Sequence, residues 1–375
     1  MYKLLIITAL YTGHGHKSIS DALEERLRAY KDVNVLTIDG FDLMDKVLQE
    51  IAEKTYGPIT RMPAKTWQLN YALGTKVAAR PMMAAVGAAI RHRFQELIRS
   101  FHPDCVLSVH PVFLGNVCAL LEDMGEDIPV IAHEADLIDI APFWFDARLR
   151  LVLAPSHEAY HSTLEGGVPP ERVREVGFPV RQRFMGYRER DMKLHDPVTV
   201  TIMSGSEGSG EILKVARELL RSTDANVNVI CGRNKVLRKK IRKALSSEYH
   251  GRLNATGFIE DIQQVMIDSD VLVMRASPNS VMEAVALNVP VILFGQLAGQ
   301  ELHNPDMMQA HGIAAYCPDP RQLARQVRAL MANGGREMEA MRARQREYAP
   351  DDAAKATAAL LYNELKLIVA ERDGD

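Results

Sequence analysis

The sequence predicts two doubly wound α/β domains, each built on a parallel sheet, that face each other across a cleft. Short apolar runs with β-branched residues alternate with stretches whose apolar residues recur about every four positions, the pattern of repeated strand–helix units. A length of 375 residues favours two domains. Residues 183–196 are polar and have no apolar period, so we place the boundary there. The predicted domains are 1–190 and 196–350, and a final helix within 351–375 returns to the first domain.

In the first domain the strand–helix pattern begins at once. Residues 3–10 form an apolar run that ends in a glycine turn. Residues 18–30 follow with apolar side chains at Ile19, Leu23 and Leu27, which is a helical spacing. Further strands are predicted at residues 33–38, 105–110, 130–133 and 151–155. Alternating units of this kind imply parallel strands with helices on both faces.

The second domain repeats this arrangement. Its predicted strands are residues 198–204, 227–231, 252–257, 271–275 and 289–294, and the last helix of the chain spans about residues 353–370. In open parallel sheets, ligands bind at the carboxyl ends of the strands, where loops meet helix N-termini. The loops that follow the strands are therefore the expected places for function.

Composition limits the class of protein. Hydrophobic residues make up 47% and charged residues 25%, which is typical of globular proteins and excludes disordered, collagen-like and disulfide-scaffold chains. None of the four cysteines forms a C-x-x-C pair, so we expect them to be small buried residues in a reducing cytoplasm. No apolar run reaches the roughly 18 residues that span a bilayer, and we expect no signal peptide.

A basic segment contrasts with the net charge of −3. From Lys54 to Arg99 there are eight Lys or Arg and one acidic residue, Glu96, which favours a local anionic partner. Apolar residues four apart, from Met82 onward, form an amphipathic stripe that we expect to lie on anionic lipid. The alternative is that the stripe packs into the domain core. The residues assigned to the membrane are Trp67, Arg80, Arg91 and Arg93.

A glycine-rich loop in the first domain carries a candidate catalytic histidine. Residues 13–18 read Gly-His-Gly-His-Lys-Ser and join the first strand to the first helix. There His16 can remove a proton from a hydroxyl, beside the N–H groups of the helix start. The alternative is a plain tight turn with two exposed histidines. Residues 157–161 match the H-E-x-x-H zinc pattern, but no convincing third ligand follows, so we expect a surface helix and no metal site.

Three polar loops follow strands of the second domain. Residues 204–210 are rich in serine and glycine, which suits close approach of a phosphate, although the spacing differs from a dinucleotide loop. Residues 275–284 open a helix that can hold a diphosphate on its N–H groups, with Glu283 placed for ribose hydroxyls; helix capping is the alternative. Residues 299–304 can bind sugar hydroxyls or form a solvated loop.

These motifs, in this order, resemble the monogalactosyldiacylglycerol synthase family and its bacterial diglucosyldiacylglycerol synthase relatives. The matching segments are residues 13–18, 135–144, 155–158, 177–180, 203–210, 275–284 and 299–304. The resemblance implies a GT-B glycosyltransferase that moves a sugar from a UDP-sugar to a lipid hydroxyl with inversion, without a required metal. The sequence departs from the family at Ala135 and Ala141, where the family has threonine and histidine, and in the glycine loops.

The resemblance also implies roles for individual residues. His16 is the general base on the acceptor hydroxyl. Glu283 binds the ribose, Phe258 lies near the uracil, and Gln300 with Glu301 binds the sugar. The whole donor set is Ser204, Gly205, Ser206, Gly208, Phe258, Arg275, Ser277, Asn279, Ser280, Glu283, Gln300, Glu301 and Asn304. The acceptor set is Gly15, Lys17, Asp136 and Trp144.

We therefore predict a cytoplasmic hexosyltransferase, peripheral on the inner face of the cell membrane, that uses a UDP-sugar and a lipid acceptor such as diacylglycerol. The expected partners are these substrates and an anionic membrane surface. No cofactor and no nucleic acid are expected, and the oligomeric state and the sugar stay open. Two alternatives remain because of Ala141 and the altered glycine loops. One is a soluble or polyprenyl-linked acceptor, and the other is a non-catalytic UDP-binding protein.

Overall fold

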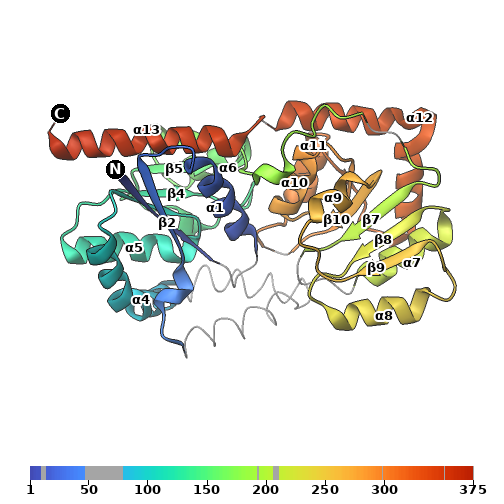
Figure 1. The fold of residues 1–375 in the computed structure, drawn as a ribbon, viewed down its shortest axis with the longest axis horizontal. Coiled ribbons are helices and arrows are strands. Elements are labelled where there is room, and N and C mark those ends of the chain that lie inside the picture. Colours follow the sequence, from blue (N-terminus) through green and yellow to red (C-terminus); the bar gives the residue numbers. More distant parts are fainter. Residues whose placement is uncertain are drawn as a thin grey trace. The chain divides into compact units, whose positions relative to one another are not determined.

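The structure is a computed structural model that describes residues 1–9, 14–46, 79–191, 194–205, 211–297, 299–349 and 351–374 (Figure 1). The chain divides into two compact units. The first unit is Met1–Gln182, Ala298–Gln300 and Asp351–Asp375, and the second is Arg183–Leu297 and Glu301–Pro350. Each unit contains a six-stranded sheet. All strand pairs in both sheets are parallel, so the predicted fold class is confirmed.

The sheet of the first unit has the order β2-β1-β3-β4-β5-β6. Its strands are β1 (Tyr2–Thr8), β2 (Val33–Asp39), β3 (Cys105–Ser108), β4 (Val130–His133), β5 (Leu151–Ala154) and β6 (Val173–Glu175). Residues 4–7 of β1 are fully buried, as expected for a central strand that helices cover on both faces. The direction of strand order reverses between β1 and β3, which makes a crevice at their carboxyl ends.

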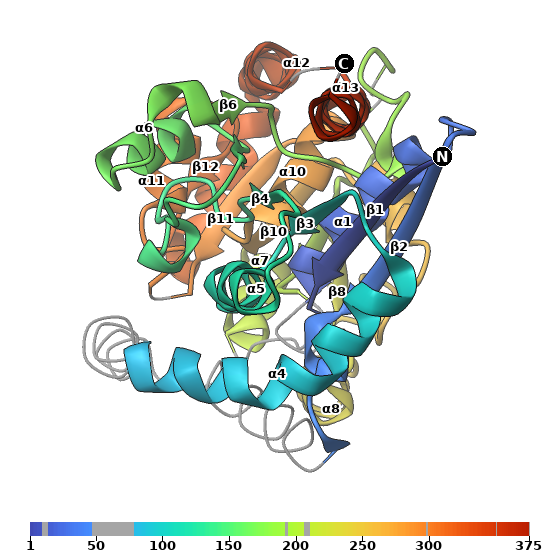
Figure 2. The same cartoon turned by 90° about the vertical axis from the view of Figure 1, so that its left-hand side faces the viewer.

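The helices of the first unit pack on this sheet. They are α1 (His14–Leu27), α4 (Ala79–Phe101), α5 (Pro111–Met124), α6 (His157–Glu165) and α13 (Ala353–Asp373), with 3₁₀ turns η1 (Gly40–Leu43), η2 (Pro142–Trp144) and η3 (Pro170–Arg172). The helix α4 packs against α5 (Figure 2). Its residues Ile90, Phe94 and Ile98 are buried, so the described part of the apolar stripe contributes to the core.

The last helix, α13, returns to the first unit as predicted. It packs on α1 and β1, and its Leu361 and Leu365 are buried. Charged groups fix its two ends. The Arg150 guanidinium contacts Glu364 at 2.9 Å and Glu371 at 2.7 Å, and Asp352, which caps the helix start, lies 3.0 Å from Arg26. A buried leucine stripe with paired ends therefore determines where α13 lies on the unit.

The sheet of the second unit has the order β12-β11-β10-β7-β8-β9. Its strands are β7 (Thr199–Met203), β8 (Asn226–Ile230), β9 (Leu253–Thr256), β10 (Val271–Arg275), β11 (Val291–Gly295) and β12 (Ala315–Tyr316). Its helices are α7 (Ile212–Ser222), α8 (Lys235–Leu245), α9 (Ile262–Ile267), α10 (Pro278–Ala286), α11 (Asn304–Ala310) and α12 (Pro320–Tyr348). The 3₁₀ turn η4 (Gln182–Phe184) lies at the start of this unit. Here the strand order reverses between β7 and β10.

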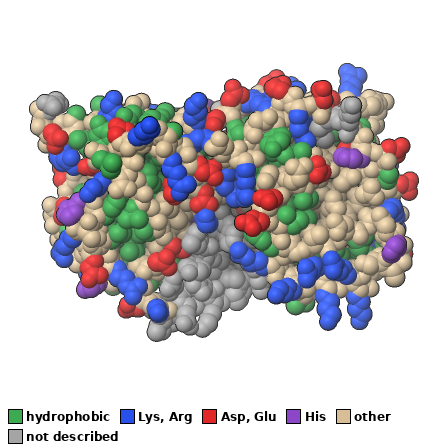
Figure 3. Space-filling model, in the orientation of Figure 1, with side chains coloured by type: hydrophobic (Ala, Val, Ile, Leu, Met, Phe, Trp, Pro, Cys, Tyr) green, Lys and Arg blue, Asp and Glu red, His purple; other side chains and the backbone are tan. Residues whose placement is uncertain are grey.

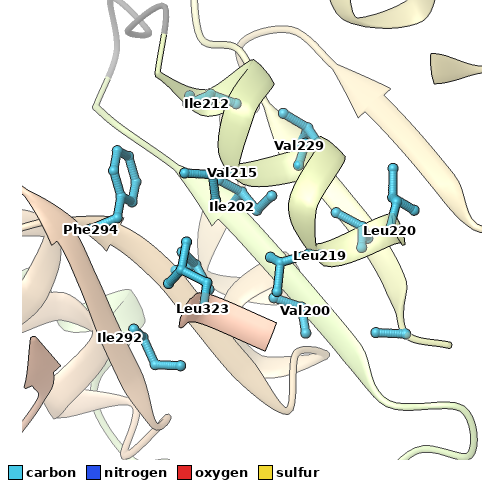
Figure 4. Packing of buried hydrophobic residues seen from close by; sticks show 14 of the residues in the cluster. Val200, Ile202, Ile212, Val215, Leu219, Leu220, Val229, Ile292, Phe294 and Leu323 are labelled. Atoms are coloured by element: carbon cyan, nitrogen blue, oxygen red, sulfur yellow. The ribbon is translucent and has the colours of Figure 1, made fainter. Parts of the chain in front are cut away.

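The core of the second unit forms between its sheet and the helices α7 and α12. Val200 and Ile202 of β7 lie near Leu219 of α7, and Leu323 of α12 lies near Phe294 of β11 (Figure 4). The 3.6-residue period of each helix brings the apolar side chains to one face, and that face covers the sheet. No helix in the described part of the chain is both long enough and apolar enough to cross a membrane.

Candidate functional site

His16 lies near the start of α1, the helix that follows β1 at the point where the strand order reverses. Its Nδ1 is 2.7 Å from the backbone oxygen of Val109, which follows β3. A carbonyl oxygen can only accept a hydrogen bond, so Nδ1 carries the proton and donates it. The neutral ring then has its lone pair on Nε2. Burial lowers the pKa of His16 to about 4, and the bond to Val109 only partly offsets that effect. At neutral pH the ring is an unprotonated base with one tautomer fixed by the fold.

A second histidine, His110, contacts His16 edge to face, with the ring centroids 4.4 Å apart. It is the N-cap of α5, and its Nδ1 accepts a hydrogen bond from the Val112 N–H at 3.3 Å. Burial, and then the neighbouring His16, hold the pKa of His110 well below its usual range. The sequence analysis missed this residue, although a polar side chain before Pro111 at a strand end is a capping signal.

The predicted acceptor residues lie in different environments. A Cβ atom added at Gly15 would have no described atom within 4 Å apart from its chain neighbours and its own helix backbone. Lys17 forms an ion pair with Asp21 one turn further along α1. Asp136 is half-buried, after β4. Trp144 is fully buried, and its indole Nε1 has no hydrogen-bond partner among the described residues. Gly15 and Lys17 are thus the two predicted acceptor residues that flank His16 along the chain.

Two buried titratable residues at the end of β4 were not predicted. Glu134 accepts a hydrogen bond from Thr163 Oγ1 at 2.7 Å, while its other carboxyl oxygen has no partner among the described residues. Burial raises the pKa of Glu134 to about 8, and the charge of Asp136 adds to this. His133 is fully buried beside it in the chain, and burial lowers its pKa to about 4. The first unit thus holds several groups in their neutral form near pH 7.

In the second unit, the reversal point of the sheet collects Ser204 and Gly205 after β7 and Arg275 at the end of β10. Gly205 has a φ of +76°, a conformation that favours glycine. A Cβ atom at this position would lie 3.8 Å from Nη2 of Arg275, so the guanidinium reaches the loop backbone. The predicted donor residues Ser206 and Gly208 lie outside the described residues.

The guanidinium of Arg275 pairs with Glu301, the predicted sugar-binding carboxylate. Nε of Arg275 is 3.1 Å from Oε2 of Glu301, and that oxygen also accepts the Leu297 N–H at 2.7 Å. Glu301 is buried. The structure therefore joins two predicted donor residues that are 26 positions apart in sequence, with the carboxylate orienting the guanidinium. Gln300 precedes this pair in the loop after β11 and is half-buried.

The helix α10 begins beside Arg275. Its N-cap, Ser277, makes no capping bond through its side chain, and Pro278 occupies the first turn. The first-turn N–H groups of Asn279 and Ser280 have no acceptor within the helix, as at any helix start. Glu283 is buried one turn further along. The α10 N-terminus thus presents backbone donors and the positive end of the helix dipole at the sheet edge.

Two further donor residues are located by the structure. Asn304 is fully buried and donates from Nδ2 to the Ala276 oxygen at 3.0 Å, which ties the 299–304 loop to the start of α10. Phe258, after β9, is 52% exposed. Arg233, after β8, lies 5.0 Å from the centre of its ring, a residue that the sequence analysis missed. Together Arg233 and Phe258 form a flat cationic and aromatic surface at the end of the sheet.

The H-E-x-x-H segment forms the start of α6. Ser156 caps the helix by accepting the Ala159 N–H at 3.0 Å. His157 and His161 lie with their Nε2 atoms 2.9 Å apart, and Nδ1 of His157 is 3.1 Å from Glu175. Across the described ranges, no three His, Cys, Asp or Glu side chains are grouped so that they could hold a metal ion.

Of the residues assigned to the membrane, Trp67 and the side chain of Arg80 lie outside the described residues. Arg91 pairs with Asp123 at 2.9 Å. Arg93 donates to the backbone oxygens of Asp42 and Met44 at 3.0 and 2.7 Å. Both described arginines are thus bonded within the unit, and their role at a membrane stays a prediction.

Two family models match the chain. The model of monogalactosyldiacylglycerol (MGDG) synthase matches residues 16–180, and the model of the glycosyltransferase family 28 C-terminal domain matches residues 199–356. A chloroplastic monogalactosyldiacylglycerol synthase from Spinacia oleracea is 27% identical over 94% of this chain and 70% of its own. A processive diacylglycerol beta-glucosyltransferase from Bacillus cytotoxicus is 24% identical over 96% of this chain and 93% of its own.

Solved structures share the fold. The crystal structure of Acinetobacter baumannii MurG superposes with a TM-score of 0.65 at 16% identity, over 97% of this chain and 100% of that one. Both family models match in chain order, each on one of the two parallel-sheet units. Residues 16–180 thus match the monogalactosyldiacylglycerol synthase family and residues 199–356 match the glycosyltransferase family 28 C-terminal domain, and the chain is a UDP-sugar glycosyltransferase of the GT-B fold.

Proposed function

We propose that this enzyme transfers a hexose from a UDP-sugar to a hydroxyl of a diacylglycerol-type lipid, with inversion, on the cytoplasmic face of a membrane. The observation that carries the proposal is His16, a neutral imidazole whose Nδ1–H is bonded to Val109 and whose Nε2 has a lone pair. Two relatives named for synthesis of diacylglycerol glycolipids support the acceptor class.

In the proposed reaction, Nε2 of His16 takes the proton of the acceptor hydroxyl. The hydroxyl oxygen attacks the anomeric carbon, the bond from that carbon to the diphosphate oxygen breaks, and UDP leaves with the bonding electrons. One displacement at the anomeric carbon inverts its configuration. The contact with His110 limits rotation of the His16 ring, and the bond to Val109 fixes its tautomer. Proton transfer to a positioned base of this kind contributes about a hundredfold or more to rate.

We assign the donor to the second unit. Arg275, oriented by Glu301, supplies guanidinium N–H donors, and the α10 N-terminus supplies backbone donors. These groups would stabilise the charge that develops on the leaving diphosphate, so we propose transfer without a metal cofactor. Glu283 would bind the ribose, and the surface formed by Arg233 and Phe258 would stack on the uracil.

The test is a UDP-release assay across a panel of UDP-sugars, with and without diacylglycerol in anionic liposomes. We expect release from one donor, stimulated by diacylglycerol. His16→Ala should keep UDP binding within twofold and lose turnover by about a thousandfold. The control is His92→Ala, because His92 is an exposed imidazole of the same unit and should leave turnover unchanged.

Each outcome bears on a separate part of the proposal. Normal turnover of His16→Ala would show that another group is the base. Release that diacylglycerol does not stimulate would favour a soluble or polyprenyl-linked acceptor. A pH profile adds a check, because a pKa of about 4 for His16 predicts that turnover loses its base only below about pH 5.

A further inference from the structure

The second unit carries a basic surface that the sequence analysis did not identify. Residues 233–243 contain seven Lys or Arg and no acidic residue, in a chain whose net charge is −3. This segment includes most of α8, and Lys and Arg side chains gather over α8 on the molecular surface (Figure 3). The basic residues are therefore denser here than in the segment 54–99, where eight are spread over a much longer stretch.

The period of α8 separates its apolar and basic residues. Leu237, Ile241 and Leu245 recur every four residues and are buried in the core of the unit. Lys235, Lys239 and Lys243 have the same spacing and are exposed on the opposite side. Lys240 is exposed beside them, and we call Lys235, Lys239, Lys240 and Lys243 the lysine face of α8. Along the helix axis, Lys235, Lys239 and Lys243 follow one another at intervals of about 6 Å.

No residue of the lysine face pairs with an acidic side chain in the part of the chain that the structure describes. Other basic residues in this unit are used internally. Arg242 of the same helix donates to the Ala255 oxygen at 3.0 Å, and Arg344 of α12 lies 2.7 Å from Glu347. Within the described residues, the four lysines thus form no ion pair, and no acidic side chain there neutralises the positive charge of their face.

We propose that the lysine face of α8 docks the second unit on an anionic lipid surface. Four or more basic residues on an amphipathic helix attract anionic headgroups. Val236, in the first turn of α8, is 79% exposed and adds an apolar contact next to the lysines. The apolar face of α8 is in the core, so the helix lies on the headgroups without inserting, and the interaction depends on salt. None of the four lysines is among the predicted donor residues or within the segment 54–99.

The test measures binding of the full chain to vesicles of phosphatidylcholine, with or without phosphatidylglycerol and without diacylglycerol or UDP-sugar. The variant is Lys235→Gln with Lys239→Gln and Lys243→Gln. Each lysine is expected to contribute about fivefold, so the triple variant should bind the anionic vesicles about 100-fold more weakly at low salt. The difference should vanish at about 1 M salt, where charges are screened beyond about 3 Å.

A matched control removes three exposed charges from other helices of the same unit, with Lys214→Gln, Arg217→Gln and Arg325→Gln. It should bind the vesicles as the unmodified chain does. An unchanged UDP affinity shows that the triple variant is folded. Equal vesicle binding by the triple variant and the unmodified chain would overturn the proposal. Tighter binding to duplex RNA than to anionic vesicles at the same salt would also overturn it. Because neither substrate is present, the result does not depend on the proposed reaction.

Discussion

The stability of the first unit should pass through a maximum near pH 6.5, because three buried groups titrate abnormally. Burial lowers the pKa of His133 to about 4 and that of His110 well below its usual range, and it raises the pKa of Glu134 to about 8. Below pH 6.5 the unfolded chain protonates both imidazoles while the folded unit does not, so acid favours unfolding. Above pH 6.5 the unfolded chain has released the carboxyl proton that folded Glu134 keeps, so alkali favours unfolding.

The magnitude follows from the number of protons. Between about pH 5 and 6.5, two imidazole protons are taken up on unfolding and one carboxyl proton is released. The net uptake of one proton lowers the free energy of unfolding by about 1.4 kcal/mol for each unit of falling pH. Between about pH 6.5 and 8 only Glu134 contributes, and the free energy falls by a similar amount for each unit of rising pH. His16, whose pKa burial likewise lowers to about 4, takes up a further proton on unfolding in the acid range and raises that slope to about 2.7 kcal/mol for each pH unit.

The assay is urea unfolding at a series of pH values, followed by tryptophan fluorescence. Trp144 is fully buried in the first unit, and a Trp67→Phe background makes it the sole tryptophan. Glu134→Gln should abolish the alkaline fall and raise the acid slope by about half, because the net proton uptake rises from two to three. Glu171→Gln is the control, because Glu171 is exposed in the same unit. A flat profile from pH 6.5 to 8, or identical profiles for Glu134→Gln and the parent, would refute the reasoning.

Two further predictions use matched pairs of substitutions. Gly205 and Gly251 have φ values of +76° and +87°, so Gly205→Ala and Gly251→Ala should each lower the unfolding free energy of the second unit by about 1 kcal/mol. In calorimetry, Gly205→Ala should bind UDP at least fivefold more weakly, whereas Gly251→Ala should keep its UDP affinity. An equal loss of UDP affinity in the two variants would argue against a phosphate site at the loop that contains Gly205. Leu361→Ala should cost about 3 kcal/mol and speed tryptic release of α13. Leu367 is 52% exposed, so Leu367→Ala should change neither the unfolding free energy nor the rate of tryptic release of α13. Equal cleavage of both variants would contradict the packing described for α13.

The repeated strand–helix pattern was sufficient to predict both sheets and most of their strands, because apolar runs buried on both faces have a strong local signature. The structure adds β6 and β12, which have only three and two residues and lack such a run. It also starts α1 at His14, four residues before the predicted helix, because the glycine-rich loop itself supplies the first turn. Short strands at a sheet edge depend on a neighbour that is distant in sequence.

In the candidate site, too, some features were predicted from the sequence and others came only from the tertiary structure. Ordered motifs singled out His16, Arg275 and Glu301, since each lies at or soon after the carboxyl end of a strand, whose place at the sheet edge the topology determines. Only the tertiary structure determined the tautomer of His16 and the ion pair between Arg275 and Glu301. His16 owes its tautomer to Val109, a residue 93 positions away, and Glu301 is paired with Arg275 across 26 positions.

The sequence alone likewise does not show which positive charges are left without a partner. The sequence counts basic residues, but it does not show which of them meet an acidic or backbone partner. Arg91 and Arg93 of α4 do meet one, at Asp123, Asp42 and Met44, while no acidic side chain of the described chain pairs with the lysine face of α8. The local pattern thus determined the elements and their order. The burial and partners that set protonation and free charge come from contacts between distant segments, and only the folded chain supplies them.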